Sequence, residues 1–161
     1  MKWDALEDES CSVARTMAVI GDRWTFLILR ECFLHVRRFE EFQSRLGIPP
    51  YILAVRLKKL TRFGVLRRTP YGPGSRRYEY ILTQKGVDLY PIMTAIIHWG
   101  DIHTVDERGR PLLHRHTDCN KFFDPVMACS ECHKPLLPSA VHVRQGPGAG
   151  RATLGTGSTI G

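Results

Sequence analysis

The stretch that decides the fold is GIPPYILAVRLKKLTRFGVLRRTPYGPGSRRYEYILT, residues 47–83. At its start, Gly47, Pro49 and Pro50 suit a tight turn that leads into the first turn of a helix. Leu53, Leu57 and Leu60 follow at helical spacing and form one apolar stripe. The pattern therefore predicts a helix over residues 50–63 with a single buried face.

A two-stranded hairpin is predicted directly after this helix. Gly64 ends the helix, and the pattern then favours strands over Val65–Tyr71 and Arg76–Leu82. The residues between the strands, GPGS at 72–75, have the composition of a tight turn. A helix followed by an arginine-rich hairpin is typical of a winged helix-turn-helix.

Other helices are predicted on both sides of this stretch. Before it, helices are expected over residues 13–20, 23–33 and 39–46. The second of these is apolar almost all round, so we expect it to be the central buried helix. After the hairpin, a long helical stretch should run to about residue 103, and Pro91 should kink or break it.

The sequence therefore predicts an α+β fold: a winged helix-turn-helix with a long C-terminal dimerisation helix and a small irregular extension that contains histidine and cysteine. The predicted regions are a DNA-binding and dimerisation domain at 10–105, the His/Cys extension at 106–144 and a disordered tail at 145–161. The tail has six glycines among its seventeen residues, a composition that cannot form a core.

Positive charge is concentrated in one part of the chain. The protein has 161 residues and a net charge of +7, but residues 37–77 hold eleven lysines and arginines against two glutamates, a local charge of +9. The rest of the chain carries a net charge of −2. This grouping favours one anionic partner that meets one surface. A solvated basic face without a partner is the alternative.

Double-stranded DNA is the partner that this arrangement favours. The second helix of a helix-turn-helix presents side chains to base edges in the major groove, and a basic hairpin can contact phosphates or the minor groove. The candidate DNA-binding residues are Arg37, Arg38, Tyr51, Val55, Arg56, Lys58, Lys59, Arg62, Arg76 and Arg77.

Several separate motifs resemble the HxlR family of winged-helix regulators. They are CSVAR at 11–15, IGDRWTFLILRE at 20–31, RRFEEF at 37–42, ILAVRL at 52–57, GVL at 64–66 and YEYILTQKG at 78–86. The resemblance implies a transcription regulator that binds two half-sites of an operator as a homodimer, with the terminal helices at the interface. An apolar stripe favours the same interface, formed by Leu89, Met93, Ile96 and Trp99.

The start of the predicted recognition helix departs from the family, whose members usually carry polar residues there. This chain has PPY at 49–51 and Val55 one turn later. Tyr51 can still form hydrogen bonds, and Val55 can pack on a thymine methyl group. We therefore expect specificity to depend more on Arg56, Lys59 and the hairpin, with a largely electrostatic, salt-dependent affinity.

Cys11 is a candidate redox sensor. The resemblance implies this role, because several family members sense electrophiles or oxidants through a cysteine at this position. Arg15 and the N-terminus of the first helix would stabilise a thiolate there. The alternative is an inert cysteine packed under the helix. A small molecule or an oxidant is therefore the expected effector.

Two spaced pairs of side chains are candidate zinc ligands: His116 with Cys119, and Cys129 with Cys132. Two residues separate the members of each pair and nine separate the pairs, a spacing that can supply four ligands to a tetrahedral zinc ion. The segment is too short and irregular to fold on apolar burial alone, so a metal would hold its structure. Reduced thiols in a flexible extension and a redox pair are the alternatives. Other available ligands are His114 and His133.

Other function classes find less support in the sequence. A thiol oxidoreductase would need a strand–CxxC–helix context, and the phosphate-loop, HExxH and GxSxG motifs are missing, so an enzyme is not expected. A dimeric winged-helix module without DNA binding is the other alternative. No apolar run is long enough to span a membrane, and residues 1–10 are acidic and unlike a signal peptide, so a cytoplasmic location is expected.

Overall fold

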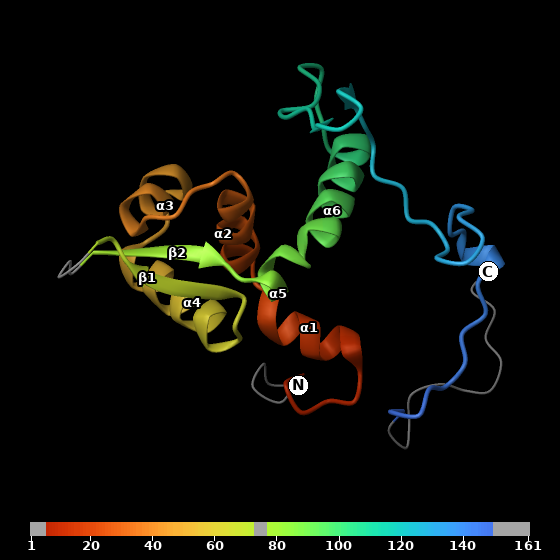
Figure 1. Ribbon diagram of the computed structural model, residues 1–161, viewed down its shortest axis with the longest axis horizontal. Coiled ribbons are helices and arrows are strands. Elements are labelled where there is room, and N and C mark those ends of the chain that lie inside the picture. The colour runs from red at the N-terminus through yellow and green to blue at the C-terminus, as the bar shows by residue number, and fades with distance from the viewer. Residues whose placement is uncertain (1–5, 73–76, 150–161) are drawn as a thin grey trace. The chain divides into compact units, whose positions relative to one another are not determined.

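The computed structural model describes residues 6–72 and 77–149 of the chain (Figure 1). Most of these residues fall into two compact units, one over residues 6–89 and the other over residues 90–146. The first unit contains the predicted winged helix-turn-helix. The second contains the long helix and the His/Cys extension.

The first unit begins with the helices α1 (Ser12–Ile20), α2 (Arg23–Phe33), α3 (Phe39–Leu46) and α4 (Pro50–Arg62). Each helix begins and ends within one residue of its predicted range. Asp22 caps α2 by accepting a hydrogen bond from the Thr25 N–H (3.1 Å), and Gly47 ends α3 in the left-handed conformation (φ 59°). These boundaries could be predicted because caps and glycines act locally.

The hairpin follows α4, as the sequence predicts. β1 (Leu66–Pro70) and β2 (Tyr78–Leu82) pair in antiparallel register, with Arg68 opposite Tyr80. Both strands are shorter than predicted. The tip at 73–76, with the predicted DNA-binding residue Arg76, lies outside the described residues.

The segment before α3 pairs with the other edge of β2. Arg38 forms an isolated antiparallel bridge with Glu79, and the Tyr80 N–H donates a hydrogen bond to the Arg37 carbonyl oxygen (2.8 Å). This pairing fixes the start of α3 against the hairpin. It therefore places two predicted DNA-binding arginines beside the wing.

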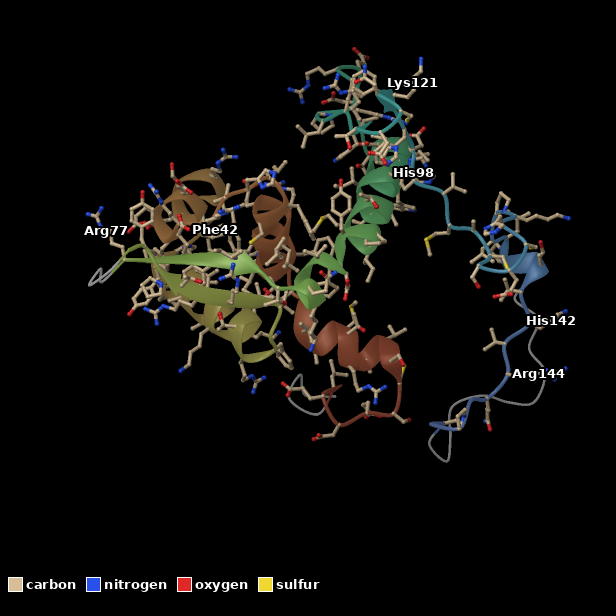
Figure 2. All side chains as sticks on the ribbon, viewed as in Figure 1. Phe42, Arg77, His98, Lys121, His142 and Arg144 are labelled. Atoms are coloured by element: carbon tan, nitrogen blue, oxygen red, sulfur yellow. The ribbon has the colours of Figure 1, made fainter. Side chains whose placement is uncertain are left out.

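The core of the first unit lies between α2, α3, α4 and the base of the hairpin (Figure 1). Its fully buried side chains include Ile28, Leu29, Phe42, Leu53, Leu57, Leu60 and Leu66 (Phe42 is marked in Figure 2). The leucine stripe of α4 and the central position of α2 are thus confirmed. One charged group is also buried: Glu31 is 3% exposed, and its carboxylate pairs with Arg30 (2.6 Å) and Arg45 (3.3 Å).

Gly86 allows a close approach between the short helix α5 (Gln84–Val87) and the base of the hairpin. The Thr83 hydroxyl caps α5 by accepting a hydrogen bond from the Gly86 N–H (3.2 Å). A Cβ atom at residue 86 would overlap the carbonyl oxygen of Val65. The backbone contact therefore requires glycine.

The second unit begins with α6 (Tyr90–His103), and its first turn contains Pro91. The helical stretch is broken at residues 88–89, as the sequence predicts. After α6, β3 (Arg115–His116) and β4 (Lys121–Phe122) form a small antiparallel hairpin. A single 3-10 turn, η2 (Pro138–Ala140), lies further along the chain.

No described residue from 106 to 149 is buried. Apolar side chains of this segment are exposed, for example Leu113 at 61% and Val126 at 70%. The predicted domain limits at residues 105 and 144 stay predictions, and the predicted tail beyond residue 149 lies outside the described residues. Within the described ranges, no helix combines the length and apolarity needed to cross a membrane.

Candidate nucleic-acid interface

The outer face of α4 is exposed along its length. Tyr51 is 72% exposed and Val55 is 54% exposed, and Lys58 and Arg62 continue the same face. These residues recur at helical spacing on the side opposite the buried leucines. The face therefore offers a phenol hydroxyl, an apolar side chain and two cations to a partner.

Arg56 and Lys59 lie on a different flank of α4, against the start of α2. Arg56 Nε donates a hydrogen bond to Asp22 Oδ1 (2.9 Å), and Lys59 Nζ lies 3.8 Å from Asp22 Oδ2. The two side chains are only 31% and 23% exposed. The sequence assigned them much of the DNA specificity, but the structure pairs them with a carboxylate of the same unit.

The Asp22 carboxylate joins these two helices. Burial would raise its pKa, but hydrogen bonds from Thr25 and the positive charges of Arg56 and Lys59 outweigh burial and hold the pKa below its ordinary value. Asp22 is therefore ionised at neutral pH. It caps α2 and at the same time binds the inner flank of α4.

The hairpin carries arginines stacked on tyrosine rings. The guanidinium carbon of Arg68 lies 3.5 Å from the centre of the Tyr78 ring, and that of Arg38 lies 4.2 Å from the centre of the Tyr71 ring. Arg38 Nε also lies 3.7 Å from a Glu79 carboxylate oxygen. Stacking orients a guanidinium group while its edge can still donate hydrogen bonds.

A groove of about 510 Å³ lies between the start of α3 and the hairpin. Its walls include the arginines Arg38, Arg68 and Arg77, and Arg77 directly precedes β2 (Figure 2). Arg68 was missing from the predicted DNA-binding residues. The signal that could have included it is its place on the strand opposite two tyrosines.

Two further predicted cations, Arg37 and Arg62, are exposed. Arg37 precedes α3, and Arg62 pairs with Glu7 of the N-terminal segment (2.6 Å) while 62% of its side chain stays exposed. An ion pair this exposed contributes little and can exchange for a phosphate. The structure thus forms two sets: Tyr51, Val55, Lys58 and Arg62 on α4, and Arg37, Arg38, Arg68 and Arg77 at the hairpin.

α6 carries an exposed apolar stripe. Ile92, Ile96, Trp99 and Ile102 are between 40% and 61% exposed and recur at helical spacing. The predicted stripe was partly wrong, because Met93 is only 3% exposed. A helix face of this kind is typical of a subunit interface.

The two cysteines of the first unit differ in access. Cys11 is exposed immediately before α1, and the next residue, Ser12, lines a groove of about 300 Å³ that also contains Arg15 and Lys85. Cys32 is buried in α2, and burial raises the pKa of its thiol to about 12. An oxidant can therefore reach Cys11 far more readily than Cys32.

The predicted zinc ligands form two pairs in the second unit. His116 Nδ1 lies 3.5 Å from Cys119 Sγ. Hydrogen bonds from the backbone of Cys132 and Glu131 and from the Cys132 side chain hold the pKa of Cys129 below its ordinary value. In the part of the chain that the structure describes, no three histidine, cysteine or acidic side chains gather as a metal site. Each pair forms, and the four-ligand site stays a prediction.

Known proteins support a regulator of this kind. The HxlR-like helix-turn-helix family model matches residues 19–108. Rv3095, an uncharacterised HTH-type transcriptional regulator of Mycobacterium tuberculosis, is 39% identical over 140 residues, which cover 87% of this chain and 89% of that protein. YdeP of Bacillus subtilis, described in the same words, is 32% identical over 94 residues, 58% of this chain and 73% of that protein.

Solved structures give the same result. PA1607, a proposed transcription factor, is 34% identical with a TM-score of 0.81, and the match covers 88% of this chain and 99% of that chain. The reduced form of the redox regulator HypR is 29% identical with a TM-score of 0.52, covering 57% of this chain and 92% of that chain. The winged helix-turn-helix fold predicted from the sequence is thereby confirmed.

Proposed function

The chain belongs to the HxlR-like helix-turn-helix family and is a transcriptional regulator, and we propose that it binds double-stranded operator DNA as a homodimer. In this proposal α4 enters the major groove and the hairpin follows the adjacent sugar–phosphate backbone. Operator binding would place its action in the cytoplasm.

The exposed outer face of α4 is the observation that carries this proposal. The Tyr51 hydroxyl can donate or accept a hydrogen bond at a base edge, and the Val55 methyl groups can pack on a thymine methyl group. Lys58 and Arg62 continue the face and can reach phosphates. Base contacts and phosphate contacts therefore come from one surface.

Arg56 and Lys59 have a different role in this proposal. Because Asp22 already pairs with both cations, they hold α4 in its orientation on α2. Arg68, stacked on a tyrosine, takes the phosphate-binding role at the hairpin instead. Arg38 joins it, because 45% of its side chain stays exposed although its Nε lies 3.7 Å from Glu79. Affinity should then depend mainly on charge, and specificity on Tyr51 and the start of α4.

Binding to operator fragments recovered from genomic DNA with the full-length protein tests the proposal. The triple variant Lys58→Ala/Arg68→Ala/Arg77→Ala should bind these fragments at least about tenfold more weakly near 0.1 M salt. Binding through fewer phosphate contacts releases fewer counterions from the DNA, and this release drives the affinity. The matched control is Arg108→Ala/Lys121→Ala/Lys134→Ala, which removes the same charge from exposed positions of the extension.

Two outcomes would contradict this assignment. Equal losses in the two triple variants would show that net charge alone drives binding. A failure of the wild-type protein to bind any genomic fragment would instead favour a dimeric module without DNA binding.

The α6 stripe supports the homodimer. Burying an aromatic or branched side chain of this size contributes roughly 1.5–3 kcal/mol, and a twofold interface would present two copies of α4 to two half-sites. Ile96→Asp and Trp99→Asp should therefore give monomers in sedimentation, whereas Val126→Asp, at an exposed position of the extension, should not. A wild-type monomer at micromolar concentration would rule out the dimer.

Redox control through Cys11 is the second part of the proposal. Its exposure and the likeness to the redox regulator HypR support it. Hydrogen peroxide would transfer one oxygen to the Cys11 sulfur as its O–O bond breaks. The thiol becomes a sulfenic acid and the other peroxide oxygen leaves as water, which changes the surface before α1. The oxidant is then the effector.

Peroxide treatment of matched variants tests the sensor. Mild oxidation should lower operator affinity in the wild type and in Cys32→Ala, whose missing thiol is buried, but not in Cys11→Ser. If Cys11→Ser responds like the wild type, the sensor is not Cys11, and the cysteines of the extension are the thiols that an oxidant reaches next, because Cys32 is buried.

A further inference from the structure

The extension presents its first pair of ligands on a tight hairpin. His116 ends β3 and Cys119 lies in the turn to β4, with His116 Nδ1 and Cys119 Sγ 3.5 Å apart. A tetrahedral zinc ion with Zn–S ≈ 2.3 Å and Zn–N ≈ 2.0–2.1 Å holds its sulfur and nitrogen ligands about 3.5 Å apart. This pair therefore already has the separation that one ion requires.

Asp118 lies beside the same histidine. Its Oδ2 is 3.9 Å from His116 Nε2, the ring nitrogen that does not face the thiol. Histidines that bind zinc through one nitrogen usually meet a carboxylate or carbonyl group at the other. The first pair thus has its two ligands and a carboxylate near the imidazole, which a shift of less than about 1 Å would bring within hydrogen-bond distance.

The second pair lies on a similar turn. Cys129 begins it, directly after Ala128, which forms an antiparallel bridge with Pro135 on the far side of the turn. The His133 N–H donates to the Cys129 carbonyl oxygen, and the Cys129 N–H donates to the Lys134 carbonyl oxygen, both at 2.9 Å. These bonds hold the CxxC loop in one conformation.

The backbone after each pair repeats the same feature. Asn120 follows the first pair with φ 56°, and His133 follows the second with φ 58°. Left-handed conformations are uncommon for residues other than glycine. Their repetition at the same position after each second ligand indicates two copies of one ligand-presenting turn.

The first turn is anchored to α6. Arg110 Nη1 lies 2.6 Å from Asp124 Oδ1, and the same carboxylate oxygen lies 3.5 Å from His98 Nδ1 of α6. Figure 2 marks His98 on the helix and Lys121 on the hairpin that this cluster ties together. Apolar burial like that in the core of the first unit does not support residues 106–149, since none of these described residues is buried.

We propose that His116, Cys119, Cys129 and Cys132 close around one structural zinc ion within a single chain. Nine residues join the pairs. Fully extended they reach roughly 30 Å, so the linker is long enough to turn back and bring both pairs to one ion. One imidazole and three thiolates suit zinc and leave no open coordination position, so the ion would support folding and not catalysis. Because the first turn is anchored to α6, closure would order the extension against that helix.

Metal content of the full-length protein, purified after growth with ample zinc, tests the proposal first. About one zinc per chain is expected in the wild type. His116→Asn, Cys119→Ser, Cys129→Ser and Cys132→Ser should each lose most of it, whereas Cys11→Ser and Cys32→Ala should retain it. Titration of the chelated protein with Co²⁺ should give tetrahedral cobalt–thiolate absorption.

Two further variants sharpen the ligand assignment. Asp118→Asn should weaken Co²⁺ binding by about 10- to 100-fold, the usual effect of losing an outer carboxylate. His133→Asn should keep the metal, because asparagine tolerates the left-handed backbone and the residue is not a ligand in the proposal. Loss of metal in His133→Asn with retention in His116→Asn would overturn the assignment.

Hydrogen exchange separates a metal site from a variant that fails to fold. Removing zinc from the wild-type chain should increase exchange over residues 106–146 and leave α2 and α4 protected. Absence of zinc together with freely reactive Cys119, Cys129 and Cys132 would overturn the proposal. A stoichiometry of one zinc per two chains would overturn closure within one chain.

Discussion

Different interactions stabilise the winged-helix unit and the His/Cys extension, each within itself. In the first, Phe42, Leu53 and Leu57 are completely buried between helices and hairpin. In the extension every described residue is at least partly exposed. Its contacts include hairpin hydrogen bonds, edge-to-face ring contacts of Phe123 and ion pairs such as Arg110 with Asp124 (2.6 Å). The comparison shows that apolar burial builds the DNA-binding platform, while the extension depends on local turns and, in our proposal, a metal.

Truncation of a core leucine is the strongest test of this difference. Leu57→Ala should lower the free energy of unfolding by about 2–5 kcal/mol, because it leaves a cavity among fully buried side chains. Val126→Ala, at a 70% exposed position of the extension, should change it by less than about 0.5 kcal/mol. Urea denaturation measures both, and equal losses would contradict the contrast between the regions.

Two glycines extend the comparison to α6. Gly86→Ala should destabilise the first unit by about 1–3 kcal/mol, because the new Cβ overlaps the Val65 carbonyl oxygen. Gly100→Ala in α6 meets its nearest neighbour, Thr104 Oγ1, at 3.6 Å and should be neutral or stabilise the helix by up to about 1 kcal/mol. Thermal denaturation of both variants checks the prediction, which fails if Gly86→Ala is tolerated.

Two aspartates with lowered pKa values should have smaller effects on the free energy of unfolding when they are replaced. Asp22→Ala should cost about 0.5–2 kcal/mol, because α2 loses its cap and two cations lose their partner. Asp106→Ala should have no measurable effect, because its pairing with Arg108 lies at the surface, where water screens the two charges. Urea denaturation at neutral pH compares them, and a larger effect at Asp106 would contradict the account.

The pH dependence of Asp22 follows from the same contacts. Its folded pKa lies below the unfolded value of about 3.9, so its stabilisation is complete above that value and is lost as the pH falls through the folded pKa. Asp22→Asn should therefore flatten the loss of stability in acid. An unchanged acid-unfolding curve would show that this carboxylate does not couple folding to pH.

The sequence predicted most of the first unit because its signals are local and periodic. Leucine spacing, the Asp22 cap, Gly47 and the hairpin turn each specify an element without reference to distant contacts. Contacts between elements were harder to predict. The pairing of Arg56 and Lys59 with Asp22 depends on how α4 crosses α2, and the burial of Met93 depends on neighbours that periodicity does not identify.

In the extension, the sequence identified the candidate ligands but not the backbone turns that carry them. Ligand spacing identified the pairs around Cys119 and Cys129, and the structure forms each of them. The spacing could not identify the left-handed backbone at Asn120 and His133, because neither residue is a glycine. Closure of the two pairs on one ion depends on a ligand outside the sequence, so it stays a proposal.

The adjacent residues Lys58 and Lys59 test the central claim most directly. Both are lysines on α4, but Lys58 lies on the exposed outer face and Lys59 faces Asp22 at 3.8 Å. The measurement is the dependence of operator affinity on salt concentration. Lys58→Ala should reduce the slope of log Kd against log salt by about one unit per lost phosphate contact, while Lys59→Ala should keep the wild-type slope. Equal changes in both variants, or a change only in Lys59→Ala, would contradict DNA binding through the outer face of α4.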